Sequence, residues 1–559
     1  MQRERRLRQA PFLFHPAILS DVMHPSPFSA RRHVAASPTL ADPHADRRKS
    51  CWLIGTATLL RLVVAALLPL GVDESYAAVV SRTLSLSYFD HPPAAFWMAH
   101  IAAQLGGESP LALRWPFVLL FALSSWLLFA LTSRLFSARA GFWTVAAAQV
   151  IPVFSLSAGS WVLPDGPLLC ASVAAALALA HAIPLADDDR HGDSATSSAS
   201  RGDASRRWLA VGAALGAAGL SKYHAALLGA GMLLFVFTDP YARRWLRRRE
   251  PYVAVLLAML CVLPVFAWNA AHDWVSFRFQ GGRAAGQGHA ITALLQNLAG
   301  QAGYLLPWFW VPLVVLLMRG LRGGPRQRAV WFCCCLGVGP VIVFTIASLG
   351  GRPGLPHWPA PGYFLLLPLL GAAIARWEAR APRVARRLMM AATAVFVALV
   401  TIVTSHAATG WVATLVPSLH RKDPAFELLA YRSLRDSLAT RGLLQRAGHV
   451  ATTDWIRGAK IGYALGPQVP MVVLNTDGRH FPYLRHVGSL NRSSGLLLVA
   501  IRREMSDADA AIVPETYRVI FDSVHHVGRI PVLRGADTAL LVSVFTTHGL
   551  RAAALPLAR

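Results

Sequence analysis

The sequence predicts an all-α polytopic membrane protein of about eleven transmembrane helices, followed by a small α/β domain at its C-terminal end. Of the 559 residues, 54% are apolar and only 15% are charged, against roughly 25% charged residues in an average soluble protein. The mean hydropathy of +0.43 agrees with this. Because a soluble chain of this length needs more charge on its surface, the composition excludes soluble, disordered and collagen-like proteins.

Eleven apolar runs predict the membrane spans. The first run, residues 51–70, is about 20 residues long, which suffices to cross a bilayer core. It lacks a small-residue cleavage site and many further runs follow it, so we interpret it as an anchor. The other ten runs lie near residues 115–131, 141–156, 168–185, 208–220, 225–237, 252–268, 303–318, 330–349, 359–375 and 388–403.

Arginine placement predicts how the spans are oriented. The chain carries a formal net charge of +25, and its arginines gather in alternate loops, near residues 134–139, 190–207, 243–249, 319–328 and 376–387. By the positive-inside rule these loops are cytoplasmic. Residues 1–50, rich in Arg, His and Pro, then form a flexible basic cytoplasmic tail. The arginine clusters lie between apolar runs, where they serve to orient the chain in the membrane. We therefore expect that the positive net charge does not indicate nucleic-acid binding.

Two regions outside the spans have their own character. Residues 72–110 form a large amphipathic first outer loop within the membrane domain, residues 51–407. Residues 408–559 carry more charge, and short β-rich runs (471–474, 496–501, 539–545) alternate with helical stretches such as 425–440. This pattern predicts an extracytoplasmic soluble α/β domain. In it, Asp454, Asp477 and His480 are expected to serve turns and surface.

Polar residues recur at the predicted outer ends of the spans, where they are costly and therefore candidates for function. Six short motifs follow one another in the chain: Asp73-Glu74-Ser75-Tyr76, Tyr88-Phe89-Asp90-His91-Pro92-Pro93, Pro164-Asp165-Gly166-Pro167, Ser221-Lys222-Tyr223-His224, Trp268-Asn269-Ala270-Ala271-His272, and His357-Trp358-Pro359-Ala360-Pro361. Because all six lie on one predicted face of the membrane, we expect them to converge on one site.

These residue types suit group transfer from a lipid-phosphate donor. A carboxylate beside an apolar span is partly desolvated, which raises its pKa toward the working range of a general base. Cationic side chains neutralise a phosphate, and aromatic rings offer flat faces to sugars. A structural role is the alternative for each of these residues. Acids also favour the first turn of a helix, and prolines favour turns. The Lys222 side chain would extend along apolar surface to place its amine in water, and Arg278 and Arg352 would be ordinary loop charges. Arg61, inside the first span, needs a partner that the sequence does not name.

The ordered motifs resemble bacterial glycosyltransferase family 39 of the GT-C superfamily. This family includes relatives of protein O-mannosyltransferases and of the lipid A aminoarabinose transferase. The likeness covers residues 51 to about 370. It implies a GT-C membrane fold, a polyprenyl-phosphate-linked sugar donor and inverting transfer on the extracytoplasmic side of the bacterial inner membrane, in the service of the cell envelope.

The resemblance also implies roles for particular residues. Asp73, with Glu74 beside it, matches the acid of the first-loop motif, and Asp165 matches a second outer-loop acid. Lys222 matches a lysine near the donor phosphate, whereas His91 departs from the family by standing where a lysine is usual. The remaining residues expected to bind the donor are Asp90, Tyr223, Arg278, Arg352, His357 and Trp358.

The predicted reaction has Asp73 orienting or deprotonating an acceptor hydroxyl while Lys222, His91 and Arg278 meet the charge of the leaving phosphate. The acceptor, a lipid, a glycan or a protein, is left open. So is a metal: no cofactor is certain, and a divalent cation held by Asp73, Glu74 and Asp165 is an alternative. The alternative function is a transporter or flippase of lipid-linked sugars, although the sequence shows no internal repeat of the kind that transporters carry.

Overall fold

The computed structural model describes residues 42–185, 201–283, 286, 288–416, 423–484, 487–501, 507–535 and 537–555. Two compact units divide the chain. The first comprises the described parts of Met1–Arg61, Phe117–Ala271 and Phe277–Phe396, and the second those of Leu62–Pro116, His272–Ser276 and Val397–Arg559. The second unit thus groups the predicted first outer loop with the C-terminal region.

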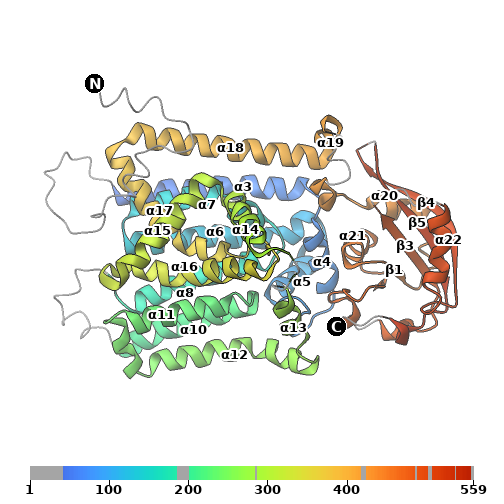
Figure 1. Cartoon of the computed structure of the whole chain (residues 1–559), viewed down its shortest axis with the longest axis horizontal. Coiled ribbons are helices and arrows are strands. Elements are labelled where there is room, and N and C mark those ends of the chain that lie inside the picture. The colour runs from blue at the N-terminus through green and yellow to red at the C-terminus, as the bar shows by residue number, and fades with distance from the viewer. Residues whose placement is uncertain are drawn as a thin grey trace. The chain divides into compact units, whose positions relative to one another are not determined.

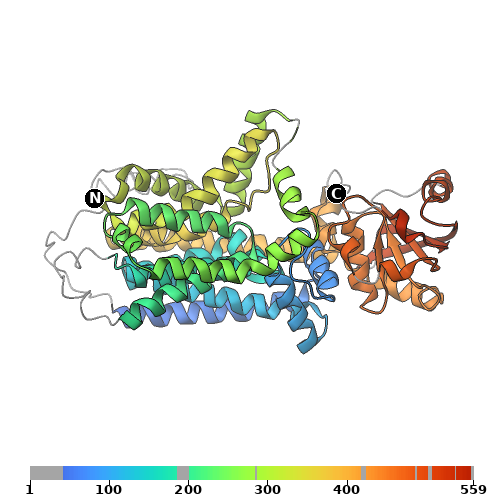
Figure 2. The ribbon, with the colours of Figure 1, turned by 90° about the horizontal axis from the view of Figure 1, so that it is seen from below.

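The first unit is built from helices that run alongside one another (Figures 1 and 2). Its longest members start or end at the loops that the sequence predicted. They are α3 (Pro43–Leu67), α6 (Pro110–Leu135), α7 (Ala138–Val150), α8 (Asp165–Ala182), α10 (Arg201–Ser221), α11 (Ala225–Thr238), α12 (Glu250–Ala271), α14 (Ala290–Leu305), α15 (Pro307–Gly323), α16 (Arg328–Ala347), α17 (Ala360–Arg380) and α18 (Pro382–Thr409).

Every predicted apolar run overlaps a helix, which confirms a multi-pass helical membrane protein. Among the described residues, seven helices are long and apolar enough to span a bilayer. The pair α14 and α15, bent by 113°, would make an eighth. The runs at 141–156, 208–220 and 225–237 fall on α7, α10 and α11, so the count of about eleven spans stays a prediction. Most of the predicted tail, residues 1–41, lies outside the described residues, but its last part is helical because α3 begins at Pro43.

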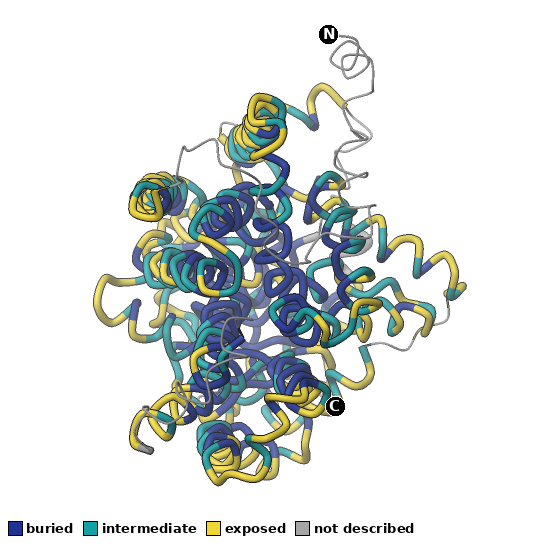
Figure 3. The backbone as a smooth tube through the Cα atoms, turned by 90° about the vertical axis from the view of Figure 1, so that its left-hand side faces the viewer, coloured by how far each residue is buried: buried dark blue, intermediate teal, exposed yellow. Residues whose placement is uncertain are grey.

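Burial separates central from peripheral helices. In the apolar window of α17, 83% of residues are buried, against 11% for α3 and 6% for α18. Figure 3 shows exposed residues along the outer sides of the helices and buried ones along their inner sides. Apolar side chains that protein does not cover have to be covered by lipid, so α3 and α18 present broad lipid-facing surfaces.

Small residues let helices α10 and α12 approach closely. A Cβ atom on Gly212 would lie 2.4 Å from the carbonyl oxygen of Ala254, and one on Gly216 would lie 2.5 Å from the Cβ of Cys261. The two glycines are four residues apart and therefore on one face of α10. Close backbone approach at small residues is a common way to pack helices in membranes, where apolar surface alone gives little driving force.

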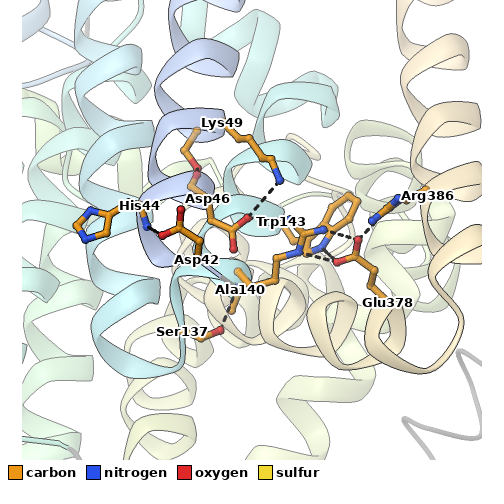
Figure 4. A network of polar contacts seen from close by, with 11 residues as sticks. Asp42, His44, Asp46, Lys49, Ser137, Ala140, Trp143, Glu378 and Arg386 are labelled. Atoms are coloured by element: carbon orange, nitrogen blue, oxygen red, sulfur yellow. Dashed lines mark hydrogen bonds and ion pairs between the residues drawn. The ribbon is translucent and has the colours of Figure 1, made fainter. Parts of the chain in front are cut away.

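An ion-pair network joins four helices of the first unit (Figure 4). Arg139, at the start of α7, donates to Asp46 of α3 and to both carboxylate oxygens of Glu378 on α17. Trp143 and Arg386 also donate to Glu378. Both arginines belong to the clusters that predicted the cytoplasmic loops. They therefore also hold these helix ends together.

The second unit contains a five-stranded sheet of order β2-β1-β3-β5-β4. Strands β1 and β2 pair in parallel, β1 and β3 do the same, and β5 is antiparallel to both β3 and β4. The strands are β1 (Val450–Thr452), β2 (Met471–Val473), β3 (Gly495–Ile501), β4 (Ser523–Arg534) and β5 (Asp537–His548). The three predicted β-runs correspond to β2, β3 and β5, whereas β1 and β4 were not predicted.

Helices complete the second unit. Helix α22 (Asp507–Thr516) packs through Val513 against a core that contains Leu497 of β3 and Phe545 of β5. The predicted helix 425–440 is broken into a 3₁₀ turn, Pro424–Leu428, and helix α20 (Arg432–Thr440). The other described α-helices of this unit are α4 (Val72–Ser81), α5 (Ala94–Gly106), α19 (Trp411–Leu415) and α21 (Trp455–Leu465), of which α21 packs on α4. Helix α13 (Val275–Gly282), like α3, α6 and α18, has residues in both units.

Candidate active site

A buried ion pair joins two of the predicted motifs in the first unit. The amine of Lys222, at the end of α10, donates to both carboxylate oxygens of Asp165 at 2.9 Å. Asp165 is the first residue of α8 and follows Pro164. The two residues are only 9% and 4% exposed. Among the described residues, these are the two acceptors of the Lys222 ammonium group, which has a third N–H to offer an incoming anion.

Histidines and aromatic rings surround this pair. The imidazoles of His357 and His224 act electrostatically on the Asp165 carboxylate. The ring of Phe344 lies 4.5 Å from that of His224 and 5.5 Å from that of Trp358. The sixth predicted motif is therefore brought next to the third and fourth, and basic side chains and flat aromatic rings lie together there.

A polar network fixes the loop that carries the sixth motif. Asn297 of α14 donates to the carbonyl oxygen of Pro353 at 2.6 Å. Gln301, one turn later, donates to Asn297 and accepts from the hydroxyl of Tyr363 on α17. Sequence reasoning missed these amides. Their spacing of four residues in an apolar helix is a signal that could have revealed them.

The remaining predicted donor residues of the first unit are more open. Arg278 and Arg352 are exposed, and the aliphatic part of Arg352 lies over Gly286. Tyr223 packs its ring 5.2 Å from that of Phe277. Arg278 and Arg352 are therefore accessible to a ligand, whereas Tyr223 is half-buried.

The partner of Arg61 is found within the first unit. Its guanidinium donates to the carbonyl oxygen and to the hydroxyl of Ser155, at 3.0 and 2.6 Å. Ser155 lies in a π-helical turn, Val153–Ala158, where the irregular backbone leaves a carbonyl available. The ring of Phe121 stacks 4.8 Å from the guanidinium carbon. This buried cation therefore has a structural role.

In the second unit lies Asp73, the predicted general base. It stands in the first turn of α4 with its side chain exposed to solvent. The surrounding protein still excludes much of the bulk water, and this desolvation raises the pKa of the carboxyl to about 6. Repulsion from Asp90 and Glu427 adds to the rise of this pKa, and Arg479 opposes it. A carboxylate with this pKa accepts a proton more readily than an ordinary aspartate.

Asp90 belongs to a network that reaches the C-terminal region. It accepts a hydrogen bond from the hydroxyl of Tyr76 at 3.0 Å. That hydroxyl accepts from the backbone N–H of His480, and the Nδ1 atom of His480 accepts from the N–H of Phe89. His91 lies beside Asp90, with its Nε2 atom 3.9 Å from the carboxylate.

His480 lies in a turn, as expected, but the expectation that it is at the surface is wrong, because it is only 2% exposed. Burial lowers the pKa of His480 to about 3, so the imidazole is neutral and can accept the Phe89 hydrogen bond. Asp454 does serve a turn, as the residue before α21 that accepts from the N–H of Arg457. The aromatic residues that follow His480 are a signal that could have distinguished this buried histidine from the turn residue Asp454.

The environment of Glu74 favours a structural role over the predicted catalytic one. Its two carboxylate oxygens accept from Arg114 at 2.7 and 2.5 Å, and one also accepts from the N–H of Gly71. Both side chains of the pair are 2% exposed. A carboxylate held in this way is poorly placed to meet a substrate or a metal ion.

The predicted site residues thus form two groups. Asp165, Lys222, His357 and Trp358 gather in the first unit, and Asp73, Asp90 and His91 in the second. The expectation that both groups belong to one site stays a prediction. Within the described part of the chain, no group of three or more His, Cys, Asp or Glu residues could hold a metal ion, and the divalent cation also stays a prediction.

Comparisons with known proteins agree with the motifs. The family model for dolichyl-phosphate-mannose-protein mannosyltransferases matches residues 90–190 and 194–268. The apo structure of ArnT from Cupriavidus metallidurans is similar at a TM-score of 0.58 and 16% identity, covering 90% of this chain and 98% of that one. For ArnT bound to undecaprenyl phosphate the TM-score is 0.56 and the identity 16%, covering 89% and 97%. No curated protein matches the sequence.

At this identity the structural likeness shows the fold, and the family model adds a match in sequence over the span from Asp90 to Trp268. Together they confirm the predicted resemblance to glycosyltransferase family 39: this chain is similar in sequence to dolichyl-phosphate-mannose-protein mannosyltransferases and has the fold of the ArnT structures.

Proposed function

We propose that this chain is an integral-membrane, inverting glycosyltransferase that moves a sugar, a hexosyl or pentosyl group, from a polyprenyl-phosphate donor to an acceptor. The observation that carries the proposal is the buried pair of Asp165 and Lys222, which holds an ammonium group with one unused N–H beside two histidines. The family match and the ArnT structure bound to undecaprenyl phosphate support a lipid-phosphate leaving group.

The proposed reaction is an in-line displacement at the anomeric carbon. Asp73 takes the proton from the acceptor hydroxyl, whose oxygen forms the new bond to the sugar carbon. The bond from that carbon to the phosphate oxygen breaks, and its electron pair leaves with the polyprenyl phosphate. Lys222, assisted by His91 and Arg278, neutralises the phosphate. Fixed positive groups aimed at developing charge are typically the largest contribution to such catalysis.

The proposal includes a location and a topology. We place the chain in the bacterial inner membrane with eleven crossings, a cytoplasmic N-terminus and an extracytoplasmic C-terminal region. The arginine-rich loops support this orientation through the positive-inside rule. Reporter fusions test it directly. A fusion at Pro93 or at the C-terminus that is active only in the cytosol contradicts the orientation.

The test of activity uses the purified full chain with polyprenyl-phosphate sugars of different head groups. Release of free polyprenyl phosphate is expected with the correct donor, and Asp73→Asn is expected to lower its rate at least about a hundredfold. Asp537→Asn, an exposed acid at the start of β5, is the matched control and should keep full activity. Undiminished turnover in Asp73→Asn removes this residue from the mechanism. The acceptor follows from screening lipids, glycans and proteins with the active donor.

The alternative function, transport of lipid-linked sugars, gains no support from the described residues. A transporter would move the donor across proteoliposomes without releasing polyprenyl phosphate. Measuring both products in one experiment therefore distinguishes the two functions.

A further inference from the structure

A large cavity lies within the second unit, apart from the Asp73 network. Its volume is about 1030 Å³, which is at the upper end of the range for small-molecule sites. Helix α4 contributes Ala78, Ser81 and Arg82 to its wall. At 3.6 residues per turn, Ala78 and Arg82 lie on the face of α4 opposite to Asp73. The cavity is therefore a separate feature from the candidate active site.

Positive charge dominates the wall of the cavity. It is lined by three arginines and a lysine but by only two carboxylates, those of Glu108 and Asp436. Glu108 already binds Arg82 through both of its oxygens, at 2.8 and 2.7 Å. Asp436 offsets one of the three remaining cations, Arg432, Arg435 and Lys460, so an excess of positive charge remains among them.

Two of these cations have side chains that are free to bind a ligand. Arg432 and Arg435 are exposed on α20, and among the described residues no hydrogen bond or ion pair is recorded for either guanidinium group. Because they are three residues apart on a helix, they present their forks side by side. Paired guanidinium forks match the oxygens of a phosphate group.

The third cation is held deeper in the wall. Lys460 is 4% exposed, and its amine donates to the carbonyl oxygen of Leu70 at 2.5 Å. Burial lowers the pKa of Lys460 to about 7, a shift that Glu74 opposes and Arg114 reinforces. An anion bound in the cavity would stabilise the charged form of this amine. The lysine is therefore poised to gain from such a ligand.

One side of the cavity is apolar and continues onto a lipid-facing helix. Residues 66–70, at the end of α3, line it, and α3 is one of the candidate spans. Leu67, in this lining, is 71% exposed, and Val63, one turn earlier, is 56% exposed. The cavity therefore borders the end of a candidate membrane span, and its lining combines cations with an alkyl surface.

We propose that this cavity binds an anionic membrane amphiphile, with its phosphate-bearing headgroup on Arg432, Arg435 and Lys460 and its acyl chain along Leu67 and Val63. A soluble anion would need the cations but not the apolar wall, whereas a neutral lipid would need the wall but not the cations. The combination fits an anionic phospholipid or a related phosphorylated lipid.

The test measures retention of radiolabelled phosphatidylglycerol by the immobilised full chain in dodecyl maltoside micelles, over a range of lipid mole fractions. The perturbed protein is the double variant Arg432→Gln/Arg435→Gln. The matched control is Arg441→Gln/Arg446→Gln, which removes two exposed arginines from the same region outside the cavity. Thermal unfolding checks that both variants fold.

The expected result is a half-saturation mole fraction at least about tenfold higher in the cavity variant and within twofold of the parent in the control, since each lost charged hydrogen bond weakens binding substantially. Phosphatidylcholine should bind the parent more weakly than phosphatidylglycerol. Equal effects of the two double variants overturn the proposal. Displacement of the lipid by millimolar glycerol 1-phosphate or inorganic phosphate also overturns it, because the site would then take a free anion. No sugar donor is used, so the outcome is independent of the proposed transferase activity.

Discussion

Replacing Glu74 by Gln tests whether this acid of the first motif has a structural role. Arg114 donates to both oxygens of Glu74 and to the carbonyl oxygens of Ala65, Leu68 and Pro69. Those carbonyls lie at the end of α3, where helix geometry leaves them without a partner. Glu74 also accepts the Gly71 N–H at the start of α4. One ion pair thus connects the end of α3, the start of α4 and helix α6.

The magnitude follows from burial. With both side chains 2% exposed, Glu74→Gln leaves the guanidinium of Arg114 buried without its counter-charge. Removing one partner of a buried ion pair costs about 3–5 kcal/mol. We expect the variant to unfold several degrees below the parent in detergent, with the turnover of the folded fraction kept within a few-fold.

The assay pairs thermal unfolding with donor turnover normalised to folded protein. Arg114→Gln should destabilise to a similar extent, and the double variant Glu74→Gln/Arg114→Gln should cost less than the sum of the two, because it leaves no unpaired charge. A Glu74→Gln protein with unchanged unfolding temperature and abolished turnover would refute this reasoning and return Glu74 to the catalytic residues.

Three further predictions concern other buried or perturbed groups. Since burial raises the pKa of Asp73 to about 6 and the base is active when deprotonated, kcat/KM should rise with pH up to about 6 and then level off; a profile flat from pH 5 to 8 contradicts this role. Asp165→Asn should cost about 3–5 kcal/mol by leaving Lys222 buried and unpaired, and adding Lys222→Met should restore part of that stability in denaturation assays. Burial lowers the pKa of His480 from 6.5 to about 3, so the unfolded chain binds more protons between these values. Stability should therefore fall by about 1.4 kcal/mol per pH unit as pH drops through this window, and His480→Gln should show a shallower slope in unfolding measured from pH 7 to 4.

Local sequence patterns predicted the apolar helices and strands β2, β3 and β5, but they did not predict strands β1 and β4. Hydropathy is a local property, and all eleven apolar runs overlap helices. Strands β2, β3 and β5 were also visible as apolar, β-branched runs. Strand β1 is only three residues long, too short to show a period. The long strand β4 contains two adjacent histidines, a glycine and a proline, and these residues hide its pattern.

The candidate site residues were predicted from the chemistry of polar side chains at the ends of the predicted membrane spans. Asp165 and Lys222 were both chosen from the sequence, 57 residues apart, and the structure pairs them. His480 was missed because a histidine in a polar loop gives no sign that Phe89, 391 positions earlier, will donate to it. Glu74 was assigned a catalytic role because the sequence does not show Arg114 folding back on it.

The sequence by itself determined that the chain is a membrane protein, where its helices lie and which charged residues stand at their ends, because these follow from the free energy of placing each side chain in lipid or in water. Only the tertiary structure decided how those charges are satisfied. Arg114 pairs with Glu74 and Lys222 pairs with Asp165, whereas Arg61 donates to uncharged oxygens of Ser155. A buried charge is stable only beside a partner, and the partner is selected by helix packing that brings distant segments together.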